Sequence, residues 1–378
     1  MVNVKVDIGV SVFMRLLRSA LWDEPLDWNG RTLNGEQMAQ LTELATEQAC
    51  TALLAQGVMR SGVRLSDNDP LLLFGQQRLV RERNRRMDVA VAAWCRHTAE
   101  AGIRICVVKG QTLSALYPDP TLRQSGDIDF LCHPADWTKA MNYLRMQLGV
   151  EVTDTNTMKH VEFELDGISY EMHSSLTDMA YPPHQRYWER VVMPEVLAGT
   201  ATVRVAAYDV PTLPPMLNVL YTFEHIVHHL IFEGVGLRQC CDLALLLTKV
   251  QLHEESEVRA LHSHLRGLGL ERAFSAVCAM LVDHLGLQES CVPCSIDGRD
   301  HDEAARLFDN IIARGNFGHK VHYAQRRGVR HGLQHLMEIG GQAWRFRRMA
   351  PAECLWRIPS MLRWWCIKLA RMARRGVR

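Results

Sequence analysis

The sequence predicts an α+β fold, in which a small mixed β-sheet with flanking helices lies between N-terminal helices and a C-terminal helical domain. Apolar residues recur at helical spacing through residues 9–60 and again through residues 71–100. Short apolar runs typical of strands, together with a hairpin signal, are confined to residues 103–173. Helical spacing returns after residue 218. Helices therefore flank a single sheet-forming segment.

Length and composition favour several domains in an ordinary folded protein. The chain has 378 residues, of which 47% are hydrophobic and 22% are charged. The net charge of +1 excludes a global electrostatic field that would select nucleic acid or a membrane. Three parts are expected: a helical segment at residues 1–100, a sheet-containing core at residues 101–212, and a helical domain at residues 213–378. Proline groups at residues 182–183 and 211–215 indicate where the core gives way to the helical domain.

The sequence predicts a cytoplasmic protein. Eleven cysteines in a chain of this length do not form a disulfide scaffold, and most lie among apolar residues as reduced, buried thiols are expected to. Residues 1–21 mix acidic and basic side chains and lack a small-residue cleavage site. No apolar run approaches the roughly 20 residues that a membrane-spanning helix needs.

The helix expected over residues 71–100 has a basic face. The simplest explanation is a solvated surface, and we favour it. The face consists of Arg78, Arg81, Arg83, Arg85 and Arg86.

A phosphate-binding turn is predicted where the first strand ends. Residues 103–108 form a β-like run that stops at Lys109 and Gly110, and a short helix is expected over residues 111–117. A helix that opens behind a glycine presents free backbone N–H groups at its positive end, and glycine lets a phosphate approach closely. Lys109, and Arg123 in the following loop, could neutralise phosphate charge.

The next strand contains an Asp-x-Asp pair. Because residues i and i+2 of a strand share a face, Asp127 and Asp129 project together, while Ile128 and Phe130 point into apolar packing. Close carboxylates repel unless a cation lies between them, and Mg²⁺ prefers carboxylate oxygen and commonly binds substrate phosphates as well. Each motif alone could be a solvated strand end or a helix terminus. Their order along the chain predicts phosphoryl or nucleotidyl transfer.

A β-hairpin follows a helix that is expected over residues 134–148. Its strands, residues 160–165 and 168–173, are joined by Asp-Gly, which strongly favours a tight hairpin turn. Glu171 and His173 then share one face of the second strand. Taken alone, Glu171 is best explained as an ordinary polar residue of an amphipathic strand.

These motifs resemble those of the uncharacterised nucleotidyltransferase family within the DNA polymerase β-like superfamily. The family pattern is Lys-Gly, then Leu, Tyr and Arg, and then Asp-Ile-Asp followed by apolar residues. A Glu-x-His strand end follows, with a histidine at the start of the hairpin, and later paired histidines, Leu-Arg and an Asp. The matching residues are Lys109, Gly110, Leu113, Tyr117, Arg123, Gly126, Asp127, Ile128, Asp129, His160, Glu171, His173, His225, His229, Leu237, Arg238 and Asp242.

The resemblance implies a polymerase β-like core at residues 101–212 in a bacterial enzyme that moves an NMP group from an NTP to an acceptor. Two Mg²⁺ ions are the implied cofactors, with Asp127 and Asp129 as shared ligands and Glu171 on the acceptor side. Lys109, Gly110 and Arg123 would bind the triphosphate. The substrate cleft could include His160, His173, His225, His229, Arg238 and Asp242. His225 and His229 lie four residues apart on one helix face, but without the His-Glu-x-x-His pattern of a zinc site.

The expected partners are an NTP, with ATP as the first candidate, and an acceptor that the sequence does not name. Two alternatives stay open. A glycosyltransferase would use Asp-x-Asp to bind a metal and a nucleotide sugar, and a regulatory, antitoxin-like protein would bind nucleotide without turnover. There is no strong nucleic-acid signal. Residues 362–378 combine an apolar and a basic stripe that could contact a membrane surface or an acidic partner, although packing on the domain is favoured.

Overall fold

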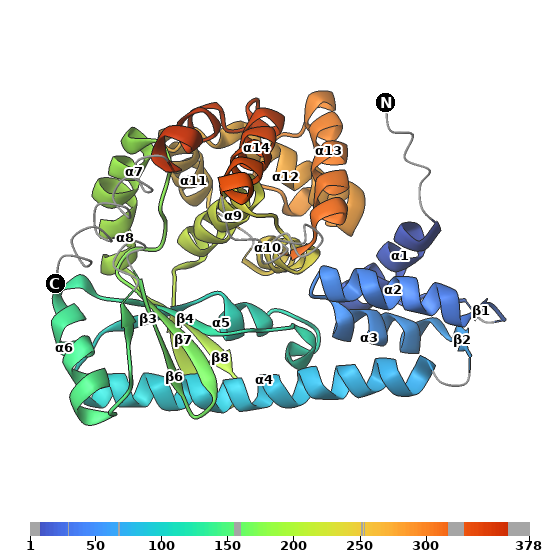
Figure 1. Ribbon diagram of the computed structural model, residues 1–378, viewed down its shortest axis with the longest axis horizontal. Helices are drawn as coiled ribbons and strands as arrows, with labels where there is room; N and C mark the ends of the chain where they lie inside the picture. Colours follow the sequence, from blue (N-terminus) through green and yellow to red (C-terminus); the bar gives the residue numbers. More distant parts are fainter. Residues whose placement is uncertain are drawn as a thin grey trace.

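The computed structural model describes residues 8–28, 30–66, 69–154, 160–250, 252, 254–316 and 329–361. The predicted α+β class is confirmed (Figure 1). A five-stranded sheet lies between the long helix α4 (Asp69–Glu100) and a helical domain, and three N-terminal helices lie beside them. Within the described residues, every helix is too short or too polar to cross a bilayer.

The N-terminal helices share an apolar core with the helical domain. They are α1 (Ile8–Trp22), α2 (Gly35–Glu47) and α3 (Thr51–Ser61), with a two-stranded parallel ribbon of β1 (Thr32–Leu33) and β2 (Arg64–Leu65). Asn34 and Gln37 form a capping box that fixes the start of α2. Trp22 Nε1 donates a 2.6 Å hydrogen bond to the carbonyl of Leu285, far along the chain. The first helices are thus part of the C-terminal core.

The five-stranded sheet is mixed, with the strand order β3-β4-β7-β6-β5. Only β4 and β7 run parallel, and the other neighbouring strands are antiparallel. The predicted hairpin is confirmed. Asp166 and Gly167 have φ angles of 53° and 71°, as the two central residues of a type I′ turn require. The strands are β3 (Ile105–Val108), β4 (Ile128–Cys132), β5 (Thr153–Asp154), β6 (His160–Leu165) and β7 (Ile168–His173).

The two faces of this sheet differ in chemistry. On the apolar face, the Trp94 ring of α4 lies 5.4 Å from Phe130, 5.4 Å from Phe163 and 5.5 Å from Tyr170. Burial of these large rings fixes the sheet on α4. Asp129 and Glu171 point to the opposite face, which looks toward the helical domain (Figure 1). The predicted alternation along β4 and β7 is therefore confirmed.

Several short elements connect the sheet to its surroundings. The helix after β3 is shorter than predicted and spans only Gly110–Ser114 (α5). The helix expected over residues 134–148 is present but changes its hydrogen-bonding pattern along its length. The remaining elements are η1 (Pro120–Leu122), η2 (Pro134–Asp136), α6 (Trp137–Asn142), η3 (Tyr143–Gln147), α7 (Pro182–Tyr187), η4 (Trp188–Val192), α8 (Met193–Ala198), β8 (Ala201–Val205) and β9 (Tyr208–Thr212).

Helix α9 (Pro215–Phe232) lies at the centre of the helical domain and faces the sheet (Figure 1). It begins three residues earlier than predicted, because proline is well suited to the first turn of a helix. The helices around it are α10 (Leu237–Val250), α11 (Glu255–Gly267), α12 (Glu271–Met280), η5 (Leu281–Leu285), η6 (Glu289–Cys291), α13 (Gly298–Arg314), α14 (Val329–Phe346) and a last helix at residues 351–361. The stripes expected over residues 362–378 lie outside the described residues.

Candidate active site

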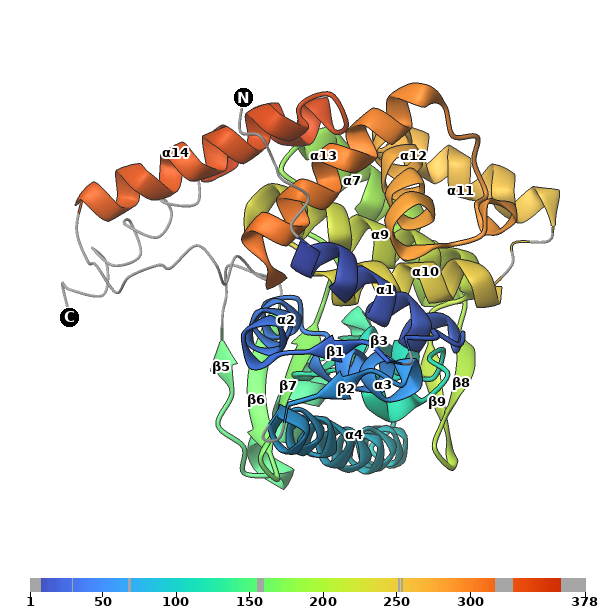
Figure 2. The same ribbon diagram turned by 90° about the vertical axis from the view of Figure 1, so that its right-hand side faces the viewer.

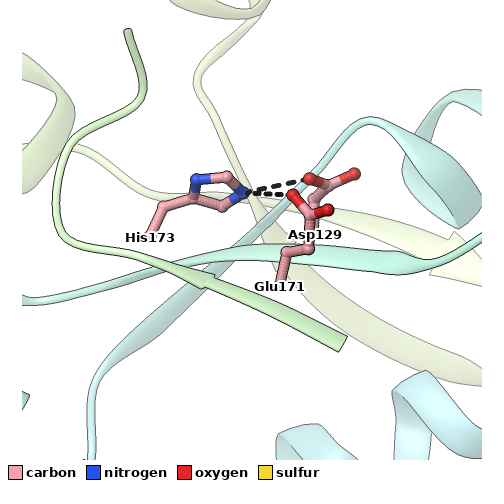
Figure 3. A group of neighbouring side chains, drawn as sticks. All are labelled: Asp129, Glu171 and His173. Atoms are coloured by element: carbon pink, nitrogen blue, oxygen red, sulfur yellow. Dashed lines mark hydrogen bonds and ion pairs between the residues drawn. The ribbon is translucent and has the colours of Figure 1, made fainter. Parts of the chain in front are cut away.

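Strands β4 and β7 place two carboxylates side by side. Asp129 is the register partner of Glu171 across the parallel pair, and Val108 of β3 is its partner on the other side. Figure 3 shows the Asp129, Glu171 and His173 side chains converging above the two strands. Asp127 immediately precedes β4, two residues before Asp129. The structure thus places Asp129 beside Glu171 on neighbouring strands, with Asp127 immediately before the strand that carries Asp129.

His173 links the carboxylates of the two strands. Its Nε2 atom lies 3.0 Å from Asp129 Oδ1 and 3.5 Å from Glu171 Oε2 (Figure 3). Burial lowers the pKa of His173, but the hydrogen bonds to Asp129 and Glu171 outweigh it and raise the pKa overall. The two acidic groups therefore stabilise a proton on the His173 ring.

Lys109 supplies the second local cation. Its Nζ atom lies 3.0 Å from Asp129 Oδ1, and only 15% of its side chain is exposed. The Lys109 backbone has φ 55° and ψ −145°, a conformation that costs a non-glycine residue about 1–3 kcal/mol. This strained turn directs Lys109 toward Asp129. Gly110, at φ 42°, continues the turn.

The carboxyls of the Asp-x-Asp pair have opposite pKa shifts. Burial and the neighbouring Asp129 and Glu171 charges raise the pKa of Asp127 to about 6. Burial also raises the pKa of Asp129, but Lys109 and the hydrogen bond from His173 hold it well below its usual range. The repulsion at Asp127 is what a cation bound between the carboxylates would relieve.

The donor set fits a hard divalent cation. Candidate ligand atoms of Asp129, Glu171 and His173 all lie within 4.8 Å of one another. Asp127 is not part of this close group, but its carboxyl interacts electrostatically with Asp129 and Glu171. Carboxylate oxygens are the ligands that Mg²⁺ prefers. A second group of possible ligands, His160, Glu162 and Glu171, continues along the same face of the sheet.

The loop before Asp127 is held by α4, which the sequence did not predict. Arg81 Nη1 lies 2.6 Å from Asp119 Oδ2, and Arg83 Nη2 donates a 2.5 Å hydrogen bond to the carbonyl of Gly126. Asn84 Nδ2 donates to the carbonyl of Arg123 at 2.6 Å. The interpretation of the basic face of this helix as simply solvated is therefore wrong for Arg81, which is partly buried, whereas Arg83 is exposed to solvent and also contacts the loop. Both arginines help to position Asp127.

Arg123 binds protein groups in this structure. Its Nε and Nη2 atoms each lie 2.7 Å from an oxygen of Asp242 on α10, and its Nη1 donates to Ser125 at 2.8 Å. The Tyr117 hydroxyl donates a further 2.7 Å hydrogen bond to Asp242. Since Arg123 and Asp242 are 4% and 2% exposed, this buried pair joins the loop to the helical domain. The phosphate-binding role of Arg123 stays a prediction.

Arg238 lies close to the carboxylates. Its Nη1 atom donates a 2.6 Å hydrogen bond to the carbonyl of Gln124, three residues before Asp127. The positive charge of Arg238 also lowers the pKa of Asp127, although burial has the larger, opposite effect. Within the described part of the chain, its buried Nε atom has no hydrogen-bond partner. Arg238 therefore has one donor that is unused within the described part of the chain and is covered from solvent.

Two histidines of α9, His225 and His229, lie close to each other, and the Lys109 charge acts on His225. The rings of His225 and His229 are 4.3 Å apart, and His225 lies 6.0 Å from the Tyr221 ring. Burial, followed by the charge of Lys109, holds the pKa of His225 well below its usual range. The His160 ring, across the hairpin, lies 5.3 Å from His173. Their substrate contacts stay predictions.

Two polar residues of this region escaped sequence reasoning. Gln111, which follows the Lys-Gly turn, donates a 2.6 Å hydrogen bond to Asp88 on α4. Glu224 of α9 is 4% exposed and accepts a 2.5 Å hydrogen bond from Thr177. Burial raises the pKa of Glu224 to about 8. Neither residue belongs to a local pattern that would have identified it.

Glu224→Gln is expected to change how stability depends on pH. Between pH about 4.5 and about 8 the folded protein retains a proton on Glu224 that the unfolded chain releases, because the pKa of Glu224 is raised to about 8 by burial. The stability of the wild type should thus fall with rising pH, by up to about 1.4 kcal/mol per pH unit from this group. The variant should lack this contribution.

Urea unfolding across this pH window tests the Glu224 prediction. The difference in stability between Glu224→Gln and wild type should grow with pH in favour of the variant. Glu164→Gln removes an exposed carboxyl and is the matched control. If the free energies of unfolding of Glu224→Gln and the wild type changed in parallel with pH, the pKa of Glu224 would not be raised by folding, and the prediction would be wrong.

Comparison with known proteins identifies the family. Residues 34–286 match the family model described as "Uncharacterised nucleotidyltransferase", and the chain belongs to this family. The resemblance based on the motifs is confirmed. A similar solved structure is the crystal structure of an antigenic nucleotidyltransferase-like protein from Paracoccidioides brasiliensis, at 12% identity and a TM-score of 0.33, covering 53% of this chain and 92% of that chain. The curated proteins contain no match.

Proposed function

We propose that this protein is a Mg²⁺-dependent nucleotidyltransferase that moves an NMP group from an NTP, with ATP as the first candidate, to an acceptor. The observation that supports this most is the register of β4 and β7, which sets Asp129 beside Glu171 and two residues from Asp127. Family membership supports the transferase class. We also propose that the sheet is a polymerase β-like core, since a strand with an Asp-x-Asp motif lies next to one with a third carboxylate.

Asp127, Asp129 and Glu171 are the residues that would hold two Mg²⁺ ions, which stabilise charge on the attacking and leaving oxygens of an in-line displacement. Lys109 and His173 keep Asp129 ionised and fix its Oδ1 atom by two 3.0 Å contacts. Preorganisation of this kind costs no rearrangement when charge develops during the reaction.

Glu171 is the proposed proton acceptor. Its side chain is 29% exposed, against 8% for Asp129, so it is the more accessible of the two to an incoming hydroxyl. The acceptor oxygen would attack the α-phosphorus of the NTP while its proton passes to Glu171. The bond from the α-phosphorus to the bridging oxygen would break, and pyrophosphate would leave.

The triphosphate would lie along the Lys109-Gly110 turn. Lys109 could contact phosphate oxygen as well as Asp129, and Gly110 lets the backbone approach closely. Arg123 is the third residue that the sequence predicts to bind the triphosphate. Arg238 is a further candidate, because its charge reaches Asp127 and its Nε atom has no hydrogen-bond partner among the described residues.

Arg238→Gln is expected to raise the KM for the NTP by about 10- to 100-fold, the equivalent of one lost charge-assisted hydrogen bond. Arg123→Gln should instead mainly lower the melting temperature, because it leaves Asp242 buried without its cation. Steady-state kinetics and thermal unfolding of both variants separate the two roles. An unchanged KM in Arg238→Gln would contradict the assignment of Arg238.

The proposed activity is tested by pyrophosphate release from each NTP with Mg²⁺, in the presence of a small-molecule and macromolecular cell extract as the acceptor source. A nucleotidyltransferase releases pyrophosphate, whereas a glycosyltransferase releases a nucleotide from a nucleotide sugar. NTP binding by calorimetry without product across all extracts would overturn the proposal in favour of a regulatory nucleotide binder.

A further inference from the structure

Exposed apolar side chains gather on the C-terminal helices. Among the described residues, twelve large hydrophobic side chains are exposed, and five of these lie between residues 337 and 358. Scattered exposed apolar residues are ordinary, but a gathered group marks an interaction surface. The five are Met337, Trp344, Leu355, Trp356 and Ile358.

Four of these side chains belong to one surface across two helices. Met337 and Trp344 are seven residues apart on α14, so they project from nearly the same side of the helix. Gly340 lies between them on that side, and Ile358 Cδ1 is 4.0 Å from the position that a Gly340 Cβ would occupy. Leu355 is one helical turn before Ile358. We call Met337, Trp344, Leu355 and Ile358 the C-terminal patch.

The C-terminal patch is not needed for packing within the helical domain. Ala343 and Phe346 of α14 are at most 6% exposed and pack against the domain from the opposite side of the helix, where Ile339 is also buried. Trp344 is 68% exposed and Leu355 is 71% exposed. Figure 2 shows α14 extending beyond the rest of the helical domain. Helix α14 therefore has two apolar faces, and one of them lacks cover from the described residues.

Basic residues surround the patch. Arg345 and Arg348 are exposed, and the Arg347 guanidinium lies 3.7 Å from the centre of the Trp344 ring. Residues 345–361, the described part of this region, contain four arginines and one acidic residue, Glu353, in a chain whose net charge is only +1. Glu353 is buried and bound to His184 at 2.8 Å, so it does not offset the surface charge.

We propose that the C-terminal patch binds the surface of an anionic lipid bilayer. Tryptophan and aliphatic side chains enter the boundary between headgroups and acyl chains, while flanking arginines attract anionic lipid. A second copy of this chain would bring the same positive charge to the contact, which disfavours it. Nucleic acid would satisfy the arginines but would leave Met337, Leu355 and Ile358 without an apolar environment.

Vesicle sedimentation of the full-length protein tests this proposal. The wild type should bind vesicles of phosphatidylglycerol mixed with phosphatidylcholine and should not bind phosphatidylcholine alone. R345Q/R347Q/R348Q should weaken binding by about 100-fold, since each arginine near an anionic surface contributes about fivefold. W344S/L355S should also weaken binding. Matched controls are R259Q/R266Q/R299Q, which makes the same change, and L71S/L72S, which removes two large apolar side chains, both at exposed positions elsewhere.

Several outcomes would overturn the proposal. Failure of the wild type to bind the anionic vesicles would do so, as would equal effects of the patch and control variants. Loss of binding only in R371Q/R374Q/R375Q would assign it to residues 362–378 instead. Two further results, each without vesicle binding by the wild type, would identify another occupant. Binding to single-stranded RNA that the patch variants lose would identify nucleic acid. Concentration-dependent dimerisation that the patch variants lose would identify a second copy of the chain. Unchanged melting temperatures establish that the variants are folded.

Discussion

Asp129→Asn is expected to lower the rate of NMP transfer by about a thousandfold or more, the scale of losing one preorganised electrostatic group of a catalytic set. The amide retains the shape of the carboxyl but not the negative charge that Lys109 and His173 contact at 3.0 Å. Both the metal affinity and the orientation of these cations depend on that charge. Initial rates of pyrophosphate release measure the effect.

Two further variants separate lost chemistry from lost folding. Asp129→Asn leaves Lys109 buried without its counter-ion, which itself costs stability. Glu171→Gln changes a more exposed carboxyl that makes no ion pair with Lys109 within the described residues, and it should lose activity with an unchanged melting temperature. Glu164→Gln makes the same change on the same face of the sheet and should keep full activity. Full activity in both Asp129→Asn and Glu171→Gln would contradict the assignment of these two carboxylates to the active site.

Asp242→Ala is expected to reduce the free energy of unfolding by about 3–5 kcal/mol, the typical cost of breaking a buried ion pair by removing one partner. Arg123 would lose both 2.7 Å contacts, and the Tyr117 hydroxyl would lose its acceptor. Urea unfolding measures the change. The exposed Arg204–Asp209 pair gives the matched control, because Asp209→Ala should cost less than about 1 kcal/mol.

The double variant Arg123→Met/Asp242→Leu tests whether the cost comes from the orphaned charge. Replacing both partners by apolar residues of similar size should recover most of the lost stability. If the double variant were as unstable as the sum of the two single changes, the stabilising effect would come from packing rather than from ionic pairing.

The parts of this fold that follow from local chemistry were predictable. Alternation along residues 128–131 and 168–173 determines which side chains share a face, and Asp166-Gly167 determines the hairpin turn, because both depend only on neighbouring residues. Asp127 and Asp129 could therefore be grouped before the structure was known, but Glu171 on the other strand could not be added to them by local chemistry. Family resemblance supplied what local chemistry could not, namely that the two strands are neighbours.

The contacts that hold the site in place were not predictable, because they join distant parts of the chain. Asp242 lies 119 residues from Arg123 in sequence, and Arg83 lies 43 residues from Gly126. A charged helix face gives no sign of which arginines will meet a loop. Glu224 likewise resembles any other helical glutamate until Thr177 and the surrounding apolar residues enclose it.

The most direct test of nucleotidyl transfer follows the phosphorus atoms of the NTP. The protein, Mg²⁺ and acceptor extract are incubated with NTP labelled at either the α- or the γ-phosphorus, in parallel with Glu171→Gln. We predict that the α-label enters the acceptor and the γ-label leaves as pyrophosphate, and that both events depend on Glu171. Transfer of the γ-label to the acceptor would contradict the account, because the protein would then be a kinase.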